Sequence, residues 1–270
     1  MRFWRRYRPA RAVKPASVIR PRLEVLEDRC VPSIDLVTNL SGSALVSGSL
    51  PFEVANAAKG DTIQFAPSLH GATINLGSTL DINKDLAIDG AGSGITVNGG
   101  GNRVFVIEQG VSADINALTI TGGATTGISN GGGIYNKGDL GLTNSTVTGN
   151  SATSGGGGIF NAPLATMTMS SDTVNNNTAA SLGGGVDNFG TLTIINCTIA
   201  ANNANLGGGI ANNAILNLVN STVASNTVTG AGADGGGIYN GGGQLALLDT
   251  IVYNPNSGAA TNDEVLGPTT

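Results

Sequence analysis

The sequence predicts an all-β fold, a parallel β-helix whose short strands stack from one coil to the next. Two observations predict this fold. A glycine-rich phrase recurs five times, and apolar residues recur at equivalent positions after each copy of it. The phrases are NGGGIYN (130–136), GGGGIFN (155–161), GGGVDN (183–188), GGGIAN (207–212) and GGGIYN (235–240). Recurrence at a fixed period is the mark of a repeat architecture, in which each repeat is one small structural unit.

A segment rich in strand-forming residues follows each phrase. The segments begin at Leu140, Met167, Leu192, Leu216 and Leu245, which lie 27, 25, 24 and 29 residues apart. Propeller blades need about 40 residues, and the helical periodicity expected of leucine-rich repeats is absent. Apolar residues recur two positions apart, as on one face of a strand. The further columns are Leu142, Met169, Ile194, Leu218 and Leu247; Val147, Val174, Ile199 and Val223; and Ile134, Ile159, Val186, Ile210 and Ile238.

The glycines and asparagines are explained by the bends of such a coil. Glycine adopts positive φ freely, and asparagine does so more readily than most residues. Equivalent asparagines of stacked coils can also bond to one another. The sequence predicts two asparagine ladders, one of Asn136, Asn161, Asn188, Asn212 and Asn240, the other of Asn150, Asn177, Asn202, Asn226 and Asn254.

The chain divides into four expected parts. Residues 1–33 form a basic leader that is disordered or removed, 34–60 a linker and N-terminal cap, 61–256 the β-helix, and 257–270 a flexible tail. The cap is expected to contain a short amphipathic helix, because an uncovered first coil would expose unpaired strand edges.

Charge is segregated along the chain. Residues 1–29 hold nine of the 13 Lys and Arg against three acids, whereas 30–270 hold four bases and fifteen acids. The acidic body argues against nucleic-acid binding. No apolar stretch is long enough to span a membrane as a helix. PRLEVLEDRCVPS (21–33) is similar to a leader of large exported bacterial surface proteins. A secreted or cell-surface location is therefore expected; the alternative is a disordered basic tail.

The repeated phrases resemble a known family. GGGIYN and GGGIFN, with their NSTV partners, resemble the right-handed parallel β-helix repeats of the pectate-lyase-like superfamily. They are more closely similar to the polymorphic outer-membrane-protein type of repeat. SLPFEVANAAKGDTIQF (49–65) is similar to the entry segment of such proteins, although Pro51 stands where a basic residue is more usual. The resemblance covers 49–254 and implies a right-handed β-helix, a scaffold that carries adhesins, lyases, hydrolases and passive spacers.

Residues suited to catalysis are few in this sequence. The β-helix lyases need a Lys or Arg base, yet no arginine follows Arg103, and Lys137 is the only lysine within the strong repeats. The β-helix hydrolases use clustered carboxylates, and the DD, GHG and RIK phrases typical of that family are absent. The only histidine, His70, is expected in a turn. No catalytic, cofactor-binding or metal-ligating residue is therefore assigned, and no cofactor is expected.

The carboxylates of the repeats are scattered. Asp139, Asp234 and Asp249 occupy different points of the coil. Asp172 and Asp187 fall in adjacent coil segments and are interpreted as solvated surface acids. No nonapeptide typical of a repeated Ca²⁺ site occurs.

Cysteines and aromatic residues fit the same architecture. Cys197 shares a column with Ser145, Asp172 and Ser221 and is interpreted as a small residue in a stack, while Cys30 lies in the leader. Tyr135, Phe160 and Tyr239 share one coil position, either as an outward strip that stacks on sugar rings or as contacts between neighbouring coils. Because Asp187 and Ala211 interrupt the row, contacts between coils are favoured.

Two functional hypotheses from different classes remain. The favoured one is a non-catalytic exported or cell-surface β-helix, structural or adhesive, which binds glycans or proteins and is not an integral membrane protein. The alternative is a carbohydrate-active enzyme, a polysaccharide lyase or glycoside hydrolase, in which Lys137, Asp172 and Asp187 converge in a groove. An autotransporter passenger is a third hypothesis.

Overall fold

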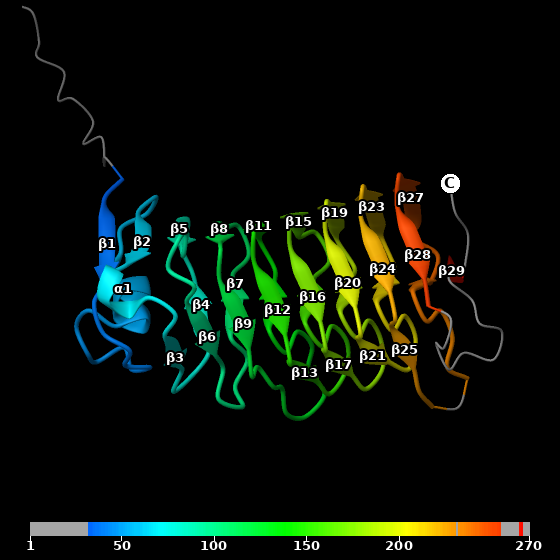
Figure 1. Ribbon diagram of the computed structural model, residues 1–270, viewed down its shortest axis with the longest axis horizontal. Helices are drawn as coiled ribbons and strands as arrows, with labels where there is room; N and C mark the ends of the chain where they lie inside the picture. The colour runs from blue at the N-terminus through cyan, green and yellow to red at the C-terminus, as the bar shows by residue number, and fades with distance from the viewer. Residues whose placement is uncertain (1–31, 231, 255–264, 267–270) are drawn as a thin grey trace, which may run out of the picture. The chain divides into compact units, whose positions relative to one another are not determined.

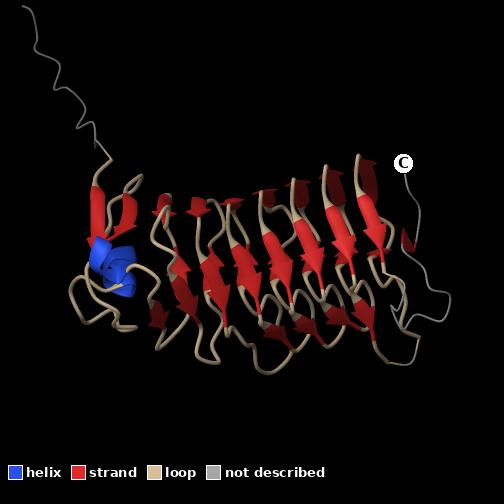
Figure 2. Ribbon diagram, viewed as in Figure 1, coloured by secondary structure: helices blue, strands red, loops and turns tan. Residues whose placement is uncertain are grey.

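The computed structural model describes residues 32–230, 232–254 and 265–266. Contacts divide the chain into two units, Met1–Val31 and Pro32–Thr270, and all described residues belong to the second. The leader, except for Pro32 and Ser33, and most of the expected tail lie outside the described residues. The second unit is a right-handed parallel β-helix (Figures 1 and 2), which confirms the predicted fold class.

Three long sheets run the length of this unit, and every strand pair in them is parallel. Sheet A contains β1 (Ile34–Val37), β2 (Thr62–Phe65), β5 (Leu86–Asp89), β8 (Ser112–Asn116), β11 (Asp139–Thr143), β15 (Thr166–Ser170), β19 (Thr191–Ile195), β23 (Ile215–Val219) and β27 (Gln244–Leu248). Sheet B contains β3 (Thr73–Asn75), β6 (Thr96–Asn98), β9 (Thr119–Thr121), β12 (Thr146–Thr148), β16 (Thr173–Asn175), β20 (Thr198–Ala200), β24 (Thr222–Ala224) and β28 (Ile251–Tyr253). Sheet C contains β4 (Leu80–Ile82), β7 (Phe105–Ile107), β10 (Ile134–Asn136), β14 (Ile159–Asn161), β18 (Val186–Asn188), β22 (Ile210–Asn212), β26 (Ile238–Asn240) and β29 (Val265–Leu266).

The four apolar columns form the core. All their members are fully buried except Leu247, which is 38% exposed on the last described strand of sheet A. Strands of equivalent position pair in register, so Leu140 lies beside Met167 and Ile134 beside Ile159. The apolar alternation read from the sequence therefore specifies which side chains fill the solenoid.

The four most regular coils contain a short additional strand between sheets B and C. These strands form sheet D, with β13 (Ser151–Ala152), β17 (Thr178–Ala179), β21 (Asn203–Ala204) and β25 (Thr227–Val228). The sequence predicted about three strands in each coil. The fourth was missed because a two-residue strand leaves no alternation to read.

The glycine phrase forms a bend at which neighbouring coils approach closely. The glycines at 156–158 show why glycine is required there. Gly156 has a φ of +65°, where a Cβ is unfavourable. A Cβ on Gly157 would lie 2.5 Å from the carbonyl oxygen of Gly184, and one on Gly158 would lie 2.7 Å from that of Gly185. Three consecutive glycines are needed here, the first for its conformation and the next two for the contact with the following coil.

Both predicted asparagine ladders are present, and their members are buried. In the first, each Nδ2 donates to the Oδ1 of the next coil's asparagine at 2.8–2.9 Å. In the second, the Oδ1 of every member after Asn150 accepts both the Nδ2 and the backbone N–H of the asparagine one coil earlier, as Asn177 does from Asn150 at 3.0 Å. The Oδ1 of Asn150 accepts the N–H of Gly123 at 2.8 Å. The ladders thus satisfy backbone groups at bends that the sheets do not reach.

The first coil is covered by α1 (Leu50–Asn56), inside the range where a helix was expected. Ser49 caps this helix, its Oγ accepting from the N–H of Phe52 at 3.2 Å. Leu50 and Val54 are buried, and the helix contacts β1, β2 and β4. A 3₁₀ turn at Pro67–Leu69 follows β2. No helix in the described ranges is long and apolar enough to cross a membrane.

We expect Asn177→Ala to destabilise the fold by roughly 3–5 kcal/mol, because several buried hydrogen-bonding groups would lose their partner at once. Asn177 donates to Val147 O at 2.9 Å and to Asn202 Oδ1 at 3.0 Å, besides accepting from Asn150. Urea unfolding followed by circular dichroism measures the loss. The matched control is Asn175→Ala on the outer face of β16, where the next coil has Ala200; equal losses for both variants would contradict the ladder's role.

Candidate functional site

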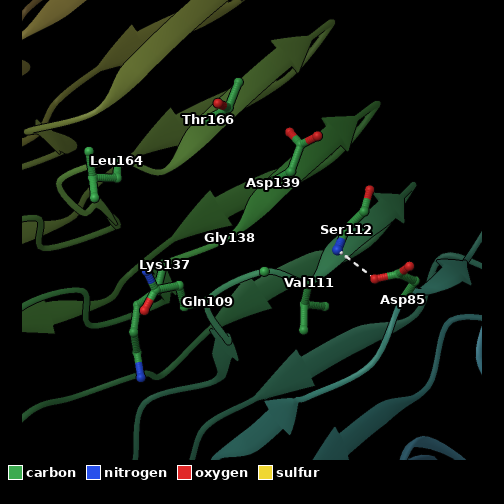
Figure 3. A pocket seen from close by; sticks show the side chains of 10 residues that line it. Asp85, Gln109, Val111, Ser112, Lys137, Gly138, Asp139, Leu164 and Thr166 are labelled. Atoms are coloured by element: carbon green, nitrogen blue, oxygen red, sulfur yellow. Dashed lines mark hydrogen bonds between the residues drawn. The ribbon is translucent and has the colours of Figure 1, made fainter.

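A groove of about 510 Å³ follows the corner at which the chain passes from sheet C into sheet A (Figure 3). We name it the corner groove. It is lined by Asp85, Gln109, Gly110, Val111, Ser112, Lys137, Gly138, Asp139, Leu164 and Thr166. Ser112, Asp139 and Thr166 begin successive strands and pair in register, and Asp85 precedes the strand before them. Since paired strands lie about 4.8 Å apart, the groove is about 14 Å long.

Asp85 is the most constrained acid of the corner groove. Its Oδ1 accepts the backbone N–H of Ser112 at 2.9 Å, and its Oδ2 pairs with Lys59 Nζ at 2.9 Å. The N–H of Ser112 and the Lys59 ammonium hold the pKa of Asp85 below its usual value. Asp85 is therefore an ionised acceptor at neutral pH.

Leu164 gives the groove an apolar projection. It is 92% exposed and has a φ of +68°, a backbone conformation that is sterically unfavourable for residues with a Cβ. Holding a non-glycine residue in this region costs about 1–2 kcal/mol. A large apolar side chain is thus kept in solvent, in a conformation that glycine would adopt more easily.

Lys137 borders the corner groove and is already paired. Its Nζ lies 2.9 and 3.0 Å from the two carboxylate oxygens of Glu108 and 5.4 Å from the ring centre of Tyr135. The guanidinium carbon of Arg103 lies 5.1 Å from the same ring centre. Tyr135 is therefore engaged by two cations of the protein itself.

The aromatic row makes contacts between neighbouring coils. The rings of Tyr135 and Phe160 meet edge to face with centres 5.2 Å apart, and those of Phe160 and Phe189 lie 5.7 Å apart. Phe160 is buried. Tyr239 is separated from Phe160 in the register by Asp187 and Ala211. The described geometry favours coil-to-coil packing over an outward strip.

Asp172 belongs to a third ladder, at the bend between sheets A and B. In this ladder a short side chain accepts the backbone N–H of its counterpart one coil earlier: Asp172 Oδ1 from Ser145 at 2.7 Å, Cys197 Sγ from Asp172 at 3.3 Å, and Ser221 Oγ from Cys197 at 3.1 Å. Burial raises the pKa of Asp172 to about 7, although the N–H groups of Ser145 and Ser170 oppose the shift. Cys197 is buried in the stack, as expected.

Asp187 lies on β18 in sheet C, between Phe160 and Ala211 in the register. It is 1% exposed, its Oδ1 has no hydrogen-bond partner, and its other oxygen faces Gly155 so closely that a Cβ there would clash with it. Burial raises the pKa of Asp187 to about 7.

The interpretation of Asp172 and Asp187 as solvated surface acids is wrong, because both are almost fully buried. Nor do they meet Lys137 in a groove: Asp172 lies at the bend between sheets A and B, Asp187 on sheet C, and only Lys137 lines the corner groove. Sequence reasoning placed both acids in the right columns but not in the right environment.

The remaining candidates do not gather around the groove. His70 is an exposed turn residue after the 3₁₀ turn. Asp234 Oδ1 accepts the N–H of Gly235, and Asp249 has a φ of +49° at a bend. Cys30 lies outside the described residues. Among the residues that the structure describes, no three His, Cys, Asp or Glu side chains are grouped as a metal site requires.

The sequence analysis singled out Asp139 and Lys137 but missed Asp85, Gln109 and Leu164 as parts of one site. In the structural register, Asp85 falls in the same column as Ser112 and Asp139. The repeat upstream of the strong phrases is too loose for this column to be aligned without the structure.

Comparisons with known proteins add a distant structural similarity. No protein-family model matches this sequence, and no curated protein matches it. The crystal structure of the pectate lyase Pel9A is similar to this chain with a TM-score of 0.48 and 14% sequence identity. The similarity covers 82% of this chain and 63% of that one, so the chain spans less than two thirds of that protein's length.

We expect the stability of this protein to fall as the pH rises from about 4 to about 8. Asp172 and Asp187 have folded-state pKa values of about 7 against a usual value of 3.8. The folded state therefore binds protons more tightly than the unfolded state, and its advantage is lost as these buried acids ionise. Thermal unfolding midpoints over this pH range measure the effect.

The variant Asp187→Ala introduces alanine, the residue found at the equivalent position of the next coil (Ala211). It measures the contribution of Asp187 separately from that of Asp172. The variant should be more stable than the parent at pH 8, by up to about 4 kcal/mol, since each unit of pKa shift corresponds to 1.36 kcal/mol. The difference should shrink towards pH 4. Asp114→Ala, which removes an exposed acid of β8, is the control, and a pH-independent gain at Asp187 would contradict the assignment.

Proposed function

We propose that this right-handed parallel β-helix is a non-catalytic, exported or cell-surface protein that holds an extended, uncharged polysaccharide in the corner groove. In this proposal the β-helix comprises 61–256, the leader 1–33, the cap 34–60 and the tail 257–270. Export is supported by the leader-like segment at 21–33. The positions of the buried acids support the absence of catalysis, and the residues that line the groove support polysaccharide binding.

One observation carries the non-catalytic assignment: the acids with a pKa suited to proton transfer lie where a substrate does not reach. A general acid or base works best with a pKa near the working pH. Asp172 and Asp187 have such values but are buried in the solenoid wall. In the groove, Asp85 is held ionised by Lys59 and the N–H of Ser112.

The groove lining suits a hydroxyl-rich ligand. Gln109, Ser112 and Thr166 offer both donors and acceptors, and Asp85 and Asp139 offer strong acceptors. Leu164, which is exposed, adds apolar surface for the C–H face of a sugar ring, whereas Val111 is buried in the core beneath the groove. Asp85 is paired with Lys59, and Lys137 with Glu108. Asp139 is then the one charged lining residue without a described ion pair, and its negative charge disfavours a polyanionic ligand. The open form over four coils favours an extended chain over a compact molecule.

We expect the full chain to co-sediment with an insoluble neutral polysaccharide and to release no new reducing ends from it. We also expect it to release no unsaturated uronates from polygalacturonate, with or without Ca²⁺. Asp139→Asn should weaken this binding about tenfold, since a hydrogen bond to a charged acceptor contributes about 1.5 kcal/mol. Asp114→Asn, outside the groove on the neighbouring strand, is the control. Cleavage of either polymer would instead establish an enzyme and refute the proposal.

Leu164→Gly separates stability from binding. We expect this variant to be as stable as the parent or about 1 kcal/mol more stable, because glycine relieves the positive φ, and to bind the polysaccharide more weakly, because the apolar projection is gone. Melting temperature and co-sedimentation are measured on the same sample. Ile128→Gly, at a residue 98% exposed and outside the groove, controls for lost apolar surface; an unchanged affinity of Leu164→Gly would remove Leu164 from the site.

A further inference from the structure

Arg103 is a half-buried cation with no carboxylate partner within ion-pair distance among the described residues. Its Nε donates to Gly131 O at 2.9 Å, and its Nη2 donates to Asn130 O at 2.7 Å and to Ser129 Oγ at 2.9 Å. These bonds occupy one edge of the guanidinium and leave Nη1 without a described partner. Burial lowers the pKa of Arg103 from its ordinary value, and the electrostatic influence of Tyr135 and Asp81 opposes this shift without cancelling it.

A polar hollow of about 230 Å³ adjoins Arg103, distinct from the corner groove. Thr79, Asn102, Thr126 and Ser129 are among its lining residues, and no acidic residue is. This contrasts with the acidic balance of residues 30–270. Arg103 is the only charged group of this wall, so the hollow is locally favourable to an anion.

Several donors of the hollow have no acceptor in the described structure. The hydroxyls of Thr79 and Thr126 make no described hydrogen bond. Ser129 Oγ accepts from Arg103, which leaves its own O–H free to donate. Arg103, Thr79, Thr126 and Ser129 come from different chain segments and line the same hollow, so their donors surround one space.

We propose that this hollow binds a tetrahedral oxyanion, the sulfate or phosphate group of an esterified ligand. A carboxylate binds arginine best through two parallel bonds to one edge of the guanidinium, and the edge formed by Nε and Nη2 is already used. A tetrahedral oxyanion accepts hydrogen bonds from several directions, which matches the spread of hydroxyl donors. The site does not depend on the polysaccharide in the corner groove.

A purely structural role explains only part of this arrangement. The bonds of Nε and Nη2 tie the 129–131 segment to the coil that carries Arg103. We call this link the Arg103 strut, and it needs no other bonds. It does not require the remaining donors to line a hollow, nor the absence of acids there. The ligand site and the strut use different nitrogens of one guanidinium.

The test uses the full chain with inorganic sulfate and inorganic phosphate as probes, followed by backbone amide chemical shifts. We expect saturable shifts at Thr126 and Ser129 with at least one of the two anions. Arg103→Lys should weaken binding at least tenfold, because a point charge replaces the planar donor group. Dextran sulfate should also bind more tightly than polygalacturonate, whose charges are carboxylates. Of inorganic sulfate and inorganic phosphate, the anion that binds more tightly indicates whether the natural ligand carries a sulfate or a phosphate ester.

Because Arg103→Lys also disturbs the strut, a second variant fills the hollow and leaves Arg103 intact. Thr126→Tyr should abolish anion binding without lowering the melting temperature, whereas Ile128→Tyr, on the same segment but outside the hollow, should bind as the parent does. All variants keep the basic residues of 1–29, so attraction of polyanions by that segment cancels in the comparison. Equal binding by Thr126→Tyr and the parent, stronger binding of polygalacturonate, or no saturable shift would overturn the proposal. Binding of neutral polysaccharide by Thr126→Tyr reports separately on the corner groove.

Discussion

The whole structure depends on coils stacking in register, because a strand of three to five residues is stabilised only by its neighbours in adjacent coils. Many backbone N–H groups at the bends also find their acceptor one coil away. The second asparagine ladder meets this need with a single side chain per coil, whose Oδ1 accepts from the backbone and from the side chain of the preceding asparagine. The consecutive glycines follow from the same requirement, since coils that approach this closely leave no room for a Cβ.

Much of this architecture could be predicted from the sequence, since each coil repeats the same physical problem. Leu140 and Met167 were recognised as core because alternation within one segment coincided with alternation in the next. The asparagine ladders could be predicted because an asparagine that recurs at the same bend can hydrogen-bond to its equivalent in the next coil. The environment of Asp172 could not be predicted: its column mixes serine, cysteine and aspartate, and this composition fits an exposed row as well as a buried acceptor ladder.

The candidate sites were harder to predict, because they lie where the repeat is irregular. Asp85 comes from a coil with no glycine phrase, so nothing in the sequence aligned it with Asp139. The surroundings of Arg103 depend on the 124–130 segment, which has no counterpart of equal length in the next coil. Binding groups on loops carried by a rigid frame are common in proteins, and a repeat search is least informative at these positions.

The third ladder has a consequence for the redox chemistry of the chain. Its only requirement is a short side chain that accepts one N–H, and a thiol meets that requirement. Cys197 is buried at 2% exposure, and burial raises the pKa of its thiol to about 11. The nucleophilic form of cysteine is the thiolate, and this residue presents almost none of it to solvent. The stack therefore holds a cysteine that is inert towards oxidants and disulfide exchange, whichever compartment the protein occupies.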